Sequence, residues 1–572
     1  MPNGILLMHE KNEPLNATLF IIALTFSVFL VSACSSGKQS TTTIMANING
    51  YSFDNNRQLQ QFQTLVFDNG RVLATGGPTL EANYPEANVI DGKGLTLLPG
   101  ITDAHGHVSS LGYTLLQIDL RGATSARQVS SLIAKYAKEK PFLNWIQGRG
   151  WNQVLWPGQQ YPTAQILDEL ISDRPVWLER IDGHAGWANS KALALAGINA
   201  NTISPPGGEI IRDRNGNPTG ILIDNAMALV NQVIPAPSDE EMAAALAAAT
   251  SHLLSLGITS VHDAGVSARE NDYYRQLANS GNLDVRLYGM ISSTDPELGE
   301  MLSAGPSNDP LDLYSARSVK VYTDGALGSR GAALLEPYSD RAGHSGLLLT
   351  SKEQLRAIFS LSIQAGFQVA IHAIGDKGNR IGLDEVEHAY ATIGGRKLRH
   401  RIEHSQVVAL DDIPRFKSLD VIASMQPTHA TSDMNMAEDR LGSDRLKGAY
   451  AWRSFLDQGS VLVSGSDFPI ELANPFHGIH AAVTRQNQLD EPDGGWISEQ
   501  AMTTEEAVRS FTIDAAWAAH QDKVLGGLTE GKWADFILLD QDLFAIPVNE
   551  LWKTTVAETW LAGKLVYAKS AE

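Results

Sequence analysis

The segment 94-GLTLLPGITDAHGHV-108 is the part of the chain around which the other motifs are arranged. A short apolar run, broken by Pro99 and Gly100, leads to His105-Gly106-His107. Residues i and i+2 of an extended segment point to the same side, so both imidazoles can reach one cation from the end of a strand. Two nearby histidines are more often surface residues than ligands, so the tripeptide alone is a weak metal signal.

Composition indicates a globular protein with an acidic surface. The chain has 572 residues, is 43% hydrophobic and carries a formal net charge of −20. A nucleic-acid or anionic-membrane partner would require a basic stripe, so this charge argues against both. Solubility is sufficient to explain the acidity.

The N-terminal region resembles the leader of a bacterial lipoprotein. Residues 17–33, ATLFIIALTFSVFLVSA, form an apolar run that ends in small residues before Cys34, the only cysteine. We expect residues 1–33 to be a signal peptide, Cys34 to be the lipidation site, and residues 34–43 to be a tether. This predicts a lipid-anchored protein of the cell envelope, at the outer membrane or the periplasmic face. The alternative is a plain transmembrane anchor or an uncleaved signal, for which the run is short.

Strand patterns at the two ends of the chain predict one small β-sandwich. Residues 64–67 and 71–74 alternate around Asp68-Asn69-Gly70, as in a hairpin, and residues 534–540 and 557–567 also read as strands. We assign residues 44–95 and 521–572 to this domain. Everything between them is then one long insertion.

The central region, residues 96–520, alternates strand-like runs with helical stretches, which is typical of a parallel α/β fold. Together with the strand leading to His105, the candidates number eight, and we predict a (β/α)8 TIM-like barrel with its active site at the C-terminal strand ends. A helix over residues 239–256, with Ser238 as its N-cap, precedes the second strand. The other seven strand candidates are GITSVHD (257–263), DVRLYGMI (284–291), SVKVYTDG (318–325), FQVAIHAIG (367–375), RHRIEHSQ (399–406), DVIASMQP (420–427) and SVLVSGSDF (460–468).

Residues 109–237, approximately, do not fit the barrel pattern and predict an inserted subdomain. They hold two strand-like pieces, NWIQGRGW (144–151) and VWLER (176–180), and a hairpin around Asn215-Gly216. Trp151 and His184 are the residues we expect to face substrate. The structural alternatives are a core tryptophan and a turn histidine.

Polar residues recur at the ends of the predicted barrel strands. Lys320 lies inside the apolar run Val319–Tyr322, where an unpaired ammonium would be costly to bury. Three further polar residues follow in order at the ends of strands five, six and eight, namely His372, His404 and Asp467. Taken singly, each has an ordinary explanation, such as a satisfied core histidine or a capping aspartate.

These motifs resemble the metal-dependent amidohydrolase superfamily, in particular amidohydrolase family 3, with the YtcJ-like hydrolases and N-substituted formamide deformylase. The resemblance covers about residues 46–567, and the combination of motifs is highly specific. Its carriers are PGITDAHGH, VKVYTDGALGSRGA, IHAIGD, HRIEHSQ, SGSDFP and, in the terminal sheet, GKWADFILLD.

The resemblance implies a binuclear metal site. It implies that Lys320 is carboxylated and bridges two divalent ions, which would remove the burial problem of a free ammonium. Zinc is favoured by imidazole and carboxylate ligands, with manganese, iron or nickel as alternatives. The implied ligands are His105, His107, Lys320, His372, His404 and Asp467.

A metal-dependent hydrolase that cleaves a non-peptide, amide-type C–N bond follows from this ligand set. A metal-bound hydroxide would attack the carbonyl carbon of a small amide or formamide-like substrate, with Asp467 as the catalytic base. His262 and Arg330 are candidates to orient substrate. D-aminoacylases bridge their metals with a cysteine and single-metal deaminases lack the bridging lysine, so both are disfavoured. The alternative from another class is a lipid-anchored binding protein on a decayed amidohydrolase fold; the oligomeric state is open, with a homo-oligomer as one option.

Overall fold

The computed structural model describes residues 41–570. The predicted signal peptide, Cys34 and most of the tether lie outside these residues. No helix within residues 41–570 combines the length and the apolar character that a transmembrane span requires.

Eight parallel strands form the barrel, and each contains part of one of the predicted strand segments. Every neighbouring pair is parallel, in the order of the sequence. The carboxyl ends of all eight therefore share one edge, which confirms the predicted fold class. The strands are β8 (Ile101–Gly106), β15 (Ile258–Val266), β16 (Arg286–Ser292), β18 (Tyr314–Tyr322), β19 (Gln368–Ala373), β20 (Arg401–His404), β21 (Ile422–Met425) and β22 (Leu462–Ser464).

The segment that follows β22 brings the last strand against the first. The amide of Asp467 donates to the carbonyl of His105 at 2.7 Å, and the amide of His107 donates to the carbonyl of Phe468 at 2.9 Å. A Cβ at Gly465 would lie 2.4 Å from the backbone nitrogen of His105. Glycine at this position is therefore required for the close approach that completes the barrel.

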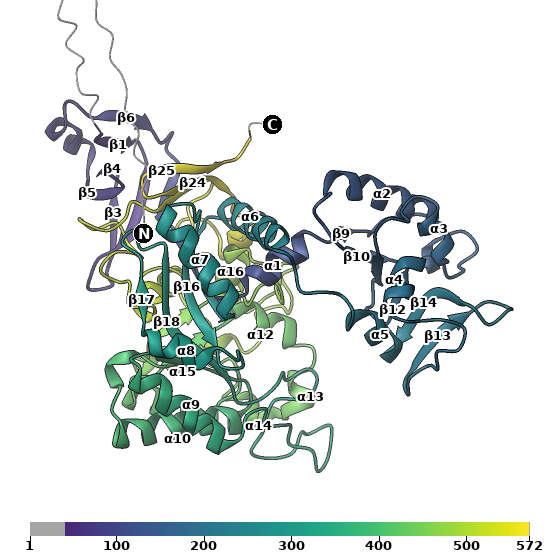
Figure 1. The fold of residues 1–572 in the computed structure, drawn as a ribbon. Helices are drawn as coiled ribbons and strands as arrows, with labels where there is room; N and C mark the ends of the chain where they lie inside the picture. The colour runs from purple at the N-terminus through teal and green to yellow at the C-terminus, as the bar shows by residue number, and fades with distance from the viewer. Residues whose placement is uncertain (1–40, 571–572) are drawn as a thin grey trace, which may run out of the picture. The chain divides into compact units, whose positions relative to one another are not determined.

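Helices alternate with the barrel strands along the chain (Figure 1). The helix before β15 spans α6 (Asp239–Ser255), and Ser238 and Glu241 form the two halves of its capping box, which confirms the predicted N-cap. The other helices around the strands are α1 (Val108–Leu115), α7 (Ala268–Ser280), α8 (Leu298–Ala304), α9 (Lys352–Gln364), α10 (Asp376–Thr392), α11 (Ile413–Ser418), α12 (Pro427–Asp433), α13 (Ala437–Leu441), α14 (Ser443–Leu446), α15 (Trp452–Asp457), α16 (Pro475–Thr484), α17 (Thr504–Ser510) and α18 (Ile513–Ala518).

The chain ends build two small sheets beside each other, one of them shared by both ends. The predicted hairpin is present as β4 (Thr64–Asp68) and β5 (Arg71–Gly76), in a sheet of order β5-β4-β1-β6 with β1 (Thr43–Ala46) and β6 (Asn88–Asp91). Figure 1 shows these purple strands beside the yellow C-terminal strands. The second sheet, of order β25-β24-β23-β7-β2-β3, contains β2 (Asn49–Phe53), β3 (Leu59–Phe62), β7 (Thr96–Pro99), β23 (Phe536–Leu539), β24 (Val556–Leu561) and β25 (Lys564–Ala568).

The opening motif crosses from the second end sheet into the barrel. Its first half, β7, pairs with β2 and β23, and its second half, β8, is the first barrel strand. The crossing falls at Gly100, where a Cβ would lie 2.2 Å from Oγ1 of Thr259. The barrel therefore begins at Ile101 rather than at residue 96, because Thr96–Pro99 pairs with the end strands.

The strands between α1 and α6 form a sheet of their own, separate from the barrel and from the two end sheets. Its order is β13-β14-β12-β11-β10-β9, and it is seen as a blue group in Figure 1. The hairpin around Asn215-Gly216 joins its strands β13 and β14 in antiparallel register. The strands and helices of this insert are β9 (Ile118–Asp119), β10 (Ile146–Trp151), β11 (Val176–Arg180), β12 (Ala185–Ala188), β13 (Gly208–Arg212), β14 (Pro218–Asp224), α2 (Ala126–Glu139), α3 (Ala164–Asp168), α4 (Ser190–Leu195) and α5 (Ala228–Asn231).

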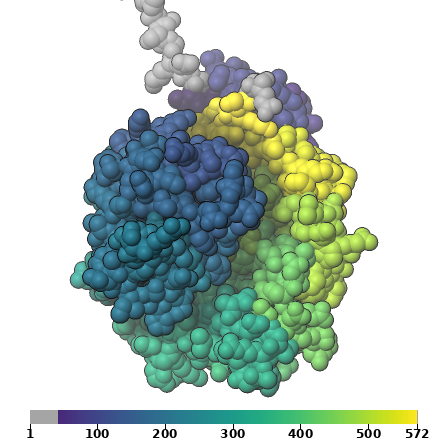
Figure 2. Space-filling view, turned by 90° about the vertical axis from the view of Figure 1, so that its right-hand side faces the viewer, coloured from purple at the N-terminus to yellow at the C-terminus, as the bar shows by residue number. Residues whose placement is uncertain are grey.

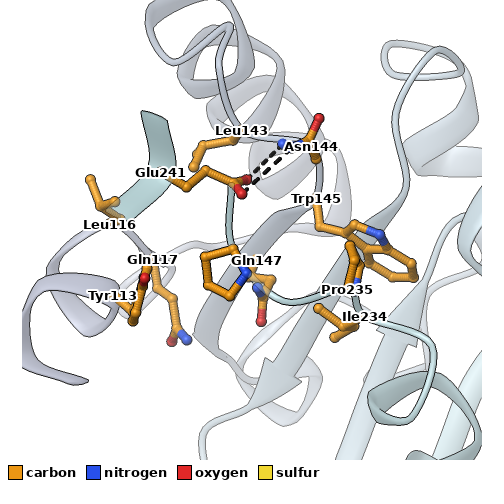
Figure 3. Close-up of a pocket in the computed structure, with 11 residues that line it drawn as sticks. Tyr113, Leu116, Gln117, Leu143, Asn144, Trp145, Gln147, Ile234, Pro235 and Glu241 are labelled. Carbon is orange, nitrogen blue, oxygen red and sulfur yellow. Dashed lines mark hydrogen bonds between the residues drawn. The ribbon is translucent and has the colours of Figure 1, made fainter. Parts of the chain in front are cut away.

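A small cavity of about 220 Å³ marks the joint between the insert and α6 (Figure 3). Glu241 of the α6 capping box accepts hydrogen bonds from the backbone and side chain of Asn144, at 2.9 and 3.5 Å. Trp145 and Pro235 line the same cavity. The lining contains none of the predicted metal ligands, so this cavity is part of the attachment of the insert.

Candidate metal centre

The six predicted metal ligands come together at the carboxyl ends of their strands. Metal-ligating atoms of His105, His404 and Asp467 lie within 4.8 Å of one another. His105 is fully buried, and the whole residues Asp467 and His404, backbone included, are 8% and 5% exposed. Residues far apart in the sequence thus form one enclosed cluster of donor atoms.

Asp467 and Lys320 join the two sides of this cluster. Oδ1 of Asp467 lies 3.0 Å from Nε2 of His107 and 3.7 Å from Nε2 of His105. The same Nε2 of His105 also lies 3.0 Å from Nζ of Lys320. Lys320 therefore points into the barrel, and one imidazole faces both the lysine and the carboxylate.

The remaining two histidines complete the cluster next to Lys320. The ring centroids of His372 and His404 are 4.4 Å apart, and those of His404 and His105 are 4.9 Å apart. Nε2 of His372 is buried and has no hydrogen-bond partner among the described residues. A buried nitrogen without a partner is costly, and a metal ion would supply the missing interaction.

A buried charge network behind the cluster orients His105. Nδ1 of His105 lies 2.5 Å from Oε2 of Glu403, whose other oxygen lies 2.5 Å from Nε of Arg401. A carboxylate on Nδ1 fixes the ring proton there and leaves Nε2 free as a ligand. Similarly, Gln426 accepts from Nδ1 of His404 at 2.8 Å, so its Nε2 is also free.

The protonation states favour ligation. Burial, followed by the charge of Lys320, lowers the pKa of His105 to about 4 and that of His372 to about 3. Burial opposes ionisation of Asp467, but the hydrogen bond to His107 and the nearby histidines hold its pKa well below the ordinary value. Burial lowers the pKa of Lys320 to about 8.

The donor set fits divalent ions. Neutral imidazoles and an ionised carboxylate are the ligands that Zn²⁺ accepts in hydrolytic sites. Their free nitrogens converge, and the orphaned Nε2 of His372 has no other satisfactory partner in the part of the chain that the structure describes. His105, His107, His372, His404, Asp467 and Lys320 are the residues that would hold the metal.

Two residues beside the centre were not predicted. His429 follows the seventh strand, and its Nε2 lies 3.7 Å from Oδ2 of Asp467. Asp324 is buried beside His372 and accepts hydrogen bonds from the amides of Ala333, Ile374 and Gly375. The strand-end rule, applied to the QPTH sequence after β21, would have found His429.

His262 occupies a different place from the one we expected. It lies in the middle of β15, is fully buried, and its Nδ1 lies 2.8 Å from Nη1 of Arg401. The strand continues to Val266, so His262 belongs to the layer beneath the metal ligands. Its Nδ1 therefore lies beside the Arg401–Glu403 pair, whereas its Nε2 has no hydrogen-bond partner among the described residues.

Trp151 is also corrected by the structure. It is fully buried in the core of the insert, packs against Trp156 and Trp187, and its indole donates to the carbonyl of Leu178 at 2.8 Å. These contacts satisfy both its apolar surface and its N–H group. Trp151 is therefore a core residue of the insert, which was the alternative to facing the substrate.

His184 lies on an exposed turn and Arg330 on a turn where it is half-buried, and each has a local partner. The His184 side chain is 75% exposed, and its Nδ1 lies 2.7 Å from Oδ1 of Asp224. Arg330 pairs with Asp340 through two hydrogen bonds of 3.0 and 2.8 Å. Neither side chain forms a hydrogen bond or ion pair with the six clustered residues in the described part of the chain.

A cavity of about 690 Å³ adjoins the loop that follows Asp467. Pro469 and Leu472 of this loop form one wall, and Arg149 and Ile181 of the insert form another. Figure 2 shows a hollow between the blue surface of the insert and the later, green and yellow segments. The insert thus contributes to the surroundings of the loop that carries Asp467.

A parallel eight-stranded barrel with these side chains at its strand ends is the arrangement of a metal-dependent hydrolase. Residues 88–567 match the model of the amidohydrolase family, to which the chain belongs, as its motifs predicted.

Relatives agree with this assignment over nearly the whole chain. The putative amidohydrolase YtcJ of Bacillus subtilis (strain 168) is 32% identical over 517 residues, which are 89% of this chain and 96% of the relative. N-substituted formamide deformylase of Arthrobacter pascens is 28% identical over 523 residues, 89% of this chain and 95% of the relative. The crystal structure of an uncharacterized metal-dependent hydrolase from Pyrococcus furiosus, 30% identical, superimposes with a TM-score of 0.73 over 88% of this chain and 99% of that one.

Proposed function

We propose that this protein hydrolyses an amide-type, non-peptide C–N bond in a small molecule, using two divalent ions, with zinc as the favoured metal. The observation that carries the proposal is the buried position of Lys320, with its Nζ 3.0 Å from Nε2 of His105 at the centre of the ligand cluster. A lysine there is unsuited to a metal site unless its charge is changed.

Carboxylation of Lys320 is part of the proposal. The neutral amine of Lys320 attacks the carbon of CO2; an N–C bond forms as one C=O π bond opens onto oxygen, and the nitrogen gives one proton to water. The product carries a negative charge and two oxygens in place of a cation. It would stand between the ion held by His105, His107 and Asp467 and the ion held by His372 and His404, and a free ammonium would repel both.

The chain's own residues supply proton transfer and orientation. A divalent ion bound at such a site lowers the pKa of water to about 7 and polarises a carbonyl oxygen. Asp467 takes the proton from the attacking water and delivers it to the departing nitrogen as the C–N bond breaks. Its ionised state, supported by His107, suits the first of these transfers.

The substrate class we propose is a small N-substituted formamide or N-acyl amine. Its support is the similarity to N-substituted formamide deformylase of Arthrobacter pascens, which extends over 89% of this chain. This substrate class also suits the role proposed for Asp467, which delivers a proton to the departing nitrogen. The competing interpretation is a binding protein on the same fold.

A hydrolysis screen of metal-loaded protein, beginning at Ser35, against a panel of N-formyl and N-acyl amines tests this function. We expect amine release from at least one member, with about two ions per chain by elemental analysis. Protein that holds no metal and releases no amine would favour the binding-protein interpretation.

We also propose that Cys34 carries the lipid anchor and keeps the enzyme at the cell envelope. The support is the sequence alone: a short apolar run, small residues before the cysteine, and the polar residues 35–43 after it. The active domain would then be tethered to the membrane surface by the lipid alone.

A further inference from the structure

His429 lies beside the metal centre and has no assigned role. It is near the start of α12, directly after β21. Its Nε2 is buried and lacks a hydrogen-bond partner within residues 41–570. Oδ2 of Asp467 lies 3.7 Å from this nitrogen, which is too long for a hydrogen bond. The imidazole nitrogen therefore faces the proposed base without being satisfied by it.

The residual exposure of the side chains identifies the open side of the centre. His105 is 0% exposed, whereas His107 is 28% and His372 is 15% exposed. His429 and Asp467 have similar exposed fractions, 13% and 11%. His429 thus shares the open side, where a substrate must approach.

The two oxygens of Asp467 have different surroundings. Oδ1 is 3.0 Å from His107 and 3.7 Å from His105, within the ligand cluster. Oδ2 faces His429. Oδ2 is therefore the oxygen that can carry a proton to a departing group. An atom lying to one side of the line between Oδ2 and Nε2 can hydrogen-bond both.

Contacts at both ends of α12 hold the imidazole in place. Gln426, just before the helix, bonds His404. Asp433, at its end, accepts hydrogen bonds from Gln406 at 2.5 Å and Tyr450 at 2.6 Å. Since the helix is fixed at each end, Nε2 of His429 has a defined position next to Oδ2.

We infer that His429 contacts the substrate and accepts a hydrogen bond from the N–H of the scissile amide; this rests on the proposed function. In this role the imidazole accepts a hydrogen bond and takes no proton from the substrate. It holds the nitrogen so that, when the C–N bond breaks and its electron pair moves to nitrogen, the proton on Oδ2 of Asp467 transfers there. The substrate class narrows accordingly to amides that carry an N–H group.

A purely structural role is the competing explanation. The ring of His429 lies parallel to that of His404, with centroids 6.0 Å apart, so it could serve as packing alone. His429→Phe keeps an aromatic ring and removes the nitrogen. His429→Gln keeps a polar group of similar reach. His388→Phe, on an exposed face of α10, is a matched control.

The experiment compares two substrates of the metal-loaded enzymes, an N-acyl benzylamine and the corresponding 4-nitroanilide. Expulsion of benzylamine needs a proton, whereas 4-nitroaniline departs with little assistance. We expect kcat of His429→Phe to fall on the order of 10²-fold for the benzylamide and much less for the nitroanilide. His429→Gln should recover part of the loss, and metal content should match the wild type.

Calorimetry with benzylamine alone provides a measurement without turnover. We expect weaker binding to His429→Phe than to the wild type or to His388→Phe. Equal losses on both substrates together with unchanged benzylamine affinity would overturn the inference. A wild type that hydrolyses neither amide contradicts the proposed function, and in that case the benzylamine affinities still decide whether His429 makes the contact.

Discussion

Nζ of Lys320 lies 3.0 Å from Nε2 of His105, and both side chains are buried in the barrel. An unpaired ammonium in such a place is unfavourable, and burial already lowers the pKa of Lys320 to about 8. The pair thus joins the first and fourth strands at a point where a buried ammonium has no carboxylate within ion-pair distance among the described residues.

Replacing Lys320 tests the proposed bridge directly. Lys320→Ala should lose most bound metal and most activity, because no other group spans the two halves of the ligand set. Added short-chain carboxylic acids should restore some of both by occupying the vacated space. The measurement is metal per chain and turnover with and without acid, with exposed Lys564→Ala as the control. Retention of two ions and full turnover without acid would rule out the bridge.

Asp467→Asn separates the base from the ligand. The substitution keeps the size and one coordinating oxygen of Asp467 but removes its ability to take a proton. Metal should be partly retained while kcat falls by a factor on the order of 10² or more. Steady-state kinetics and elemental analysis check this, beside exposed Asp444→Asn. Turnover near that of the wild type would assign proton transfer to another group.

Glu403→Gln tests the support behind His105. The change removes the charge that fixes the ring proton on Nδ1 of His105, so metal affinity should fall about 10- to 100-fold. It also leaves Arg401 partly unpaired in the interior, which costs about 3–5 kcal/mol when a buried pair is broken. Chelator competition and thermal unfolding measure the two effects, with exposed Glu353→Gln as the control. Unchanged metal affinity would contradict the orienting role.

We expect the burial of His400 to make the protein less stable in mild acid. It is fully buried, its Nδ1 accepts from the amide of Val369 at 2.9 Å, and burial lowers its pKa to about 3. Below the ordinary pKa of about 6.5, the unfolded chain binds this proton and the folded chain does not. The contribution of His400 to the free energy of unfolding is therefore complete above about pH 6.5, its ordinary pKa, and declines as the pH falls below it.

The corresponding test is His400→Gln, which can still accept from Val369. Between pH 7 and pH 5, the wild type should lose about 2 kcal/mol more stability than the variant, from the difference in the histidine pKa between the two states. Melting temperatures of both proteins at the two pH values measure this. Parallel losses in the two proteins would show that His400 does not contribute.

Cys34→Ala tests the anchor. Labelled palmitate should enter the wild type and be absent from the variant, which should be poorly retained in membranes. In a Gram-negative host, Ser35 in place of aspartate favours transport to the outer membrane, so Ser35→Asp should shift the protein to the inner membrane. Equal labelling of the wild type and Cys34→Ala would reject lipidation at this residue.

The clustering of the six candidate metal ligands could be predicted from sequence because the strand pattern places them. Parallel strands that follow one another in order end on one edge of the barrel, so polar residues at their ends must meet there. His372 follows an apolar run directly, whereas His404 follows the strand segment Arg401–Glu403 and Asp467 follows the segment 461–466, and the structure brings the three together. Local pattern and chain order were sufficient for this part of the site.

Tertiary structure alone decided how each side chain is used. His105 and Glu403 are 298 positions apart, and only the closed barrel sets the carboxylate behind the imidazole. Similarly, Trp151 and His262 became interior residues because their partners, Trp187 and Arg401, come from other strands. Burial and hydrogen-bond partners depend on contacts across the fold, which periodicity along one strand does not contain. The sequence by itself determined the barrel, the order of its strands and the strand-end positions of the candidate ligands; the packing determined which polar residues face the open side.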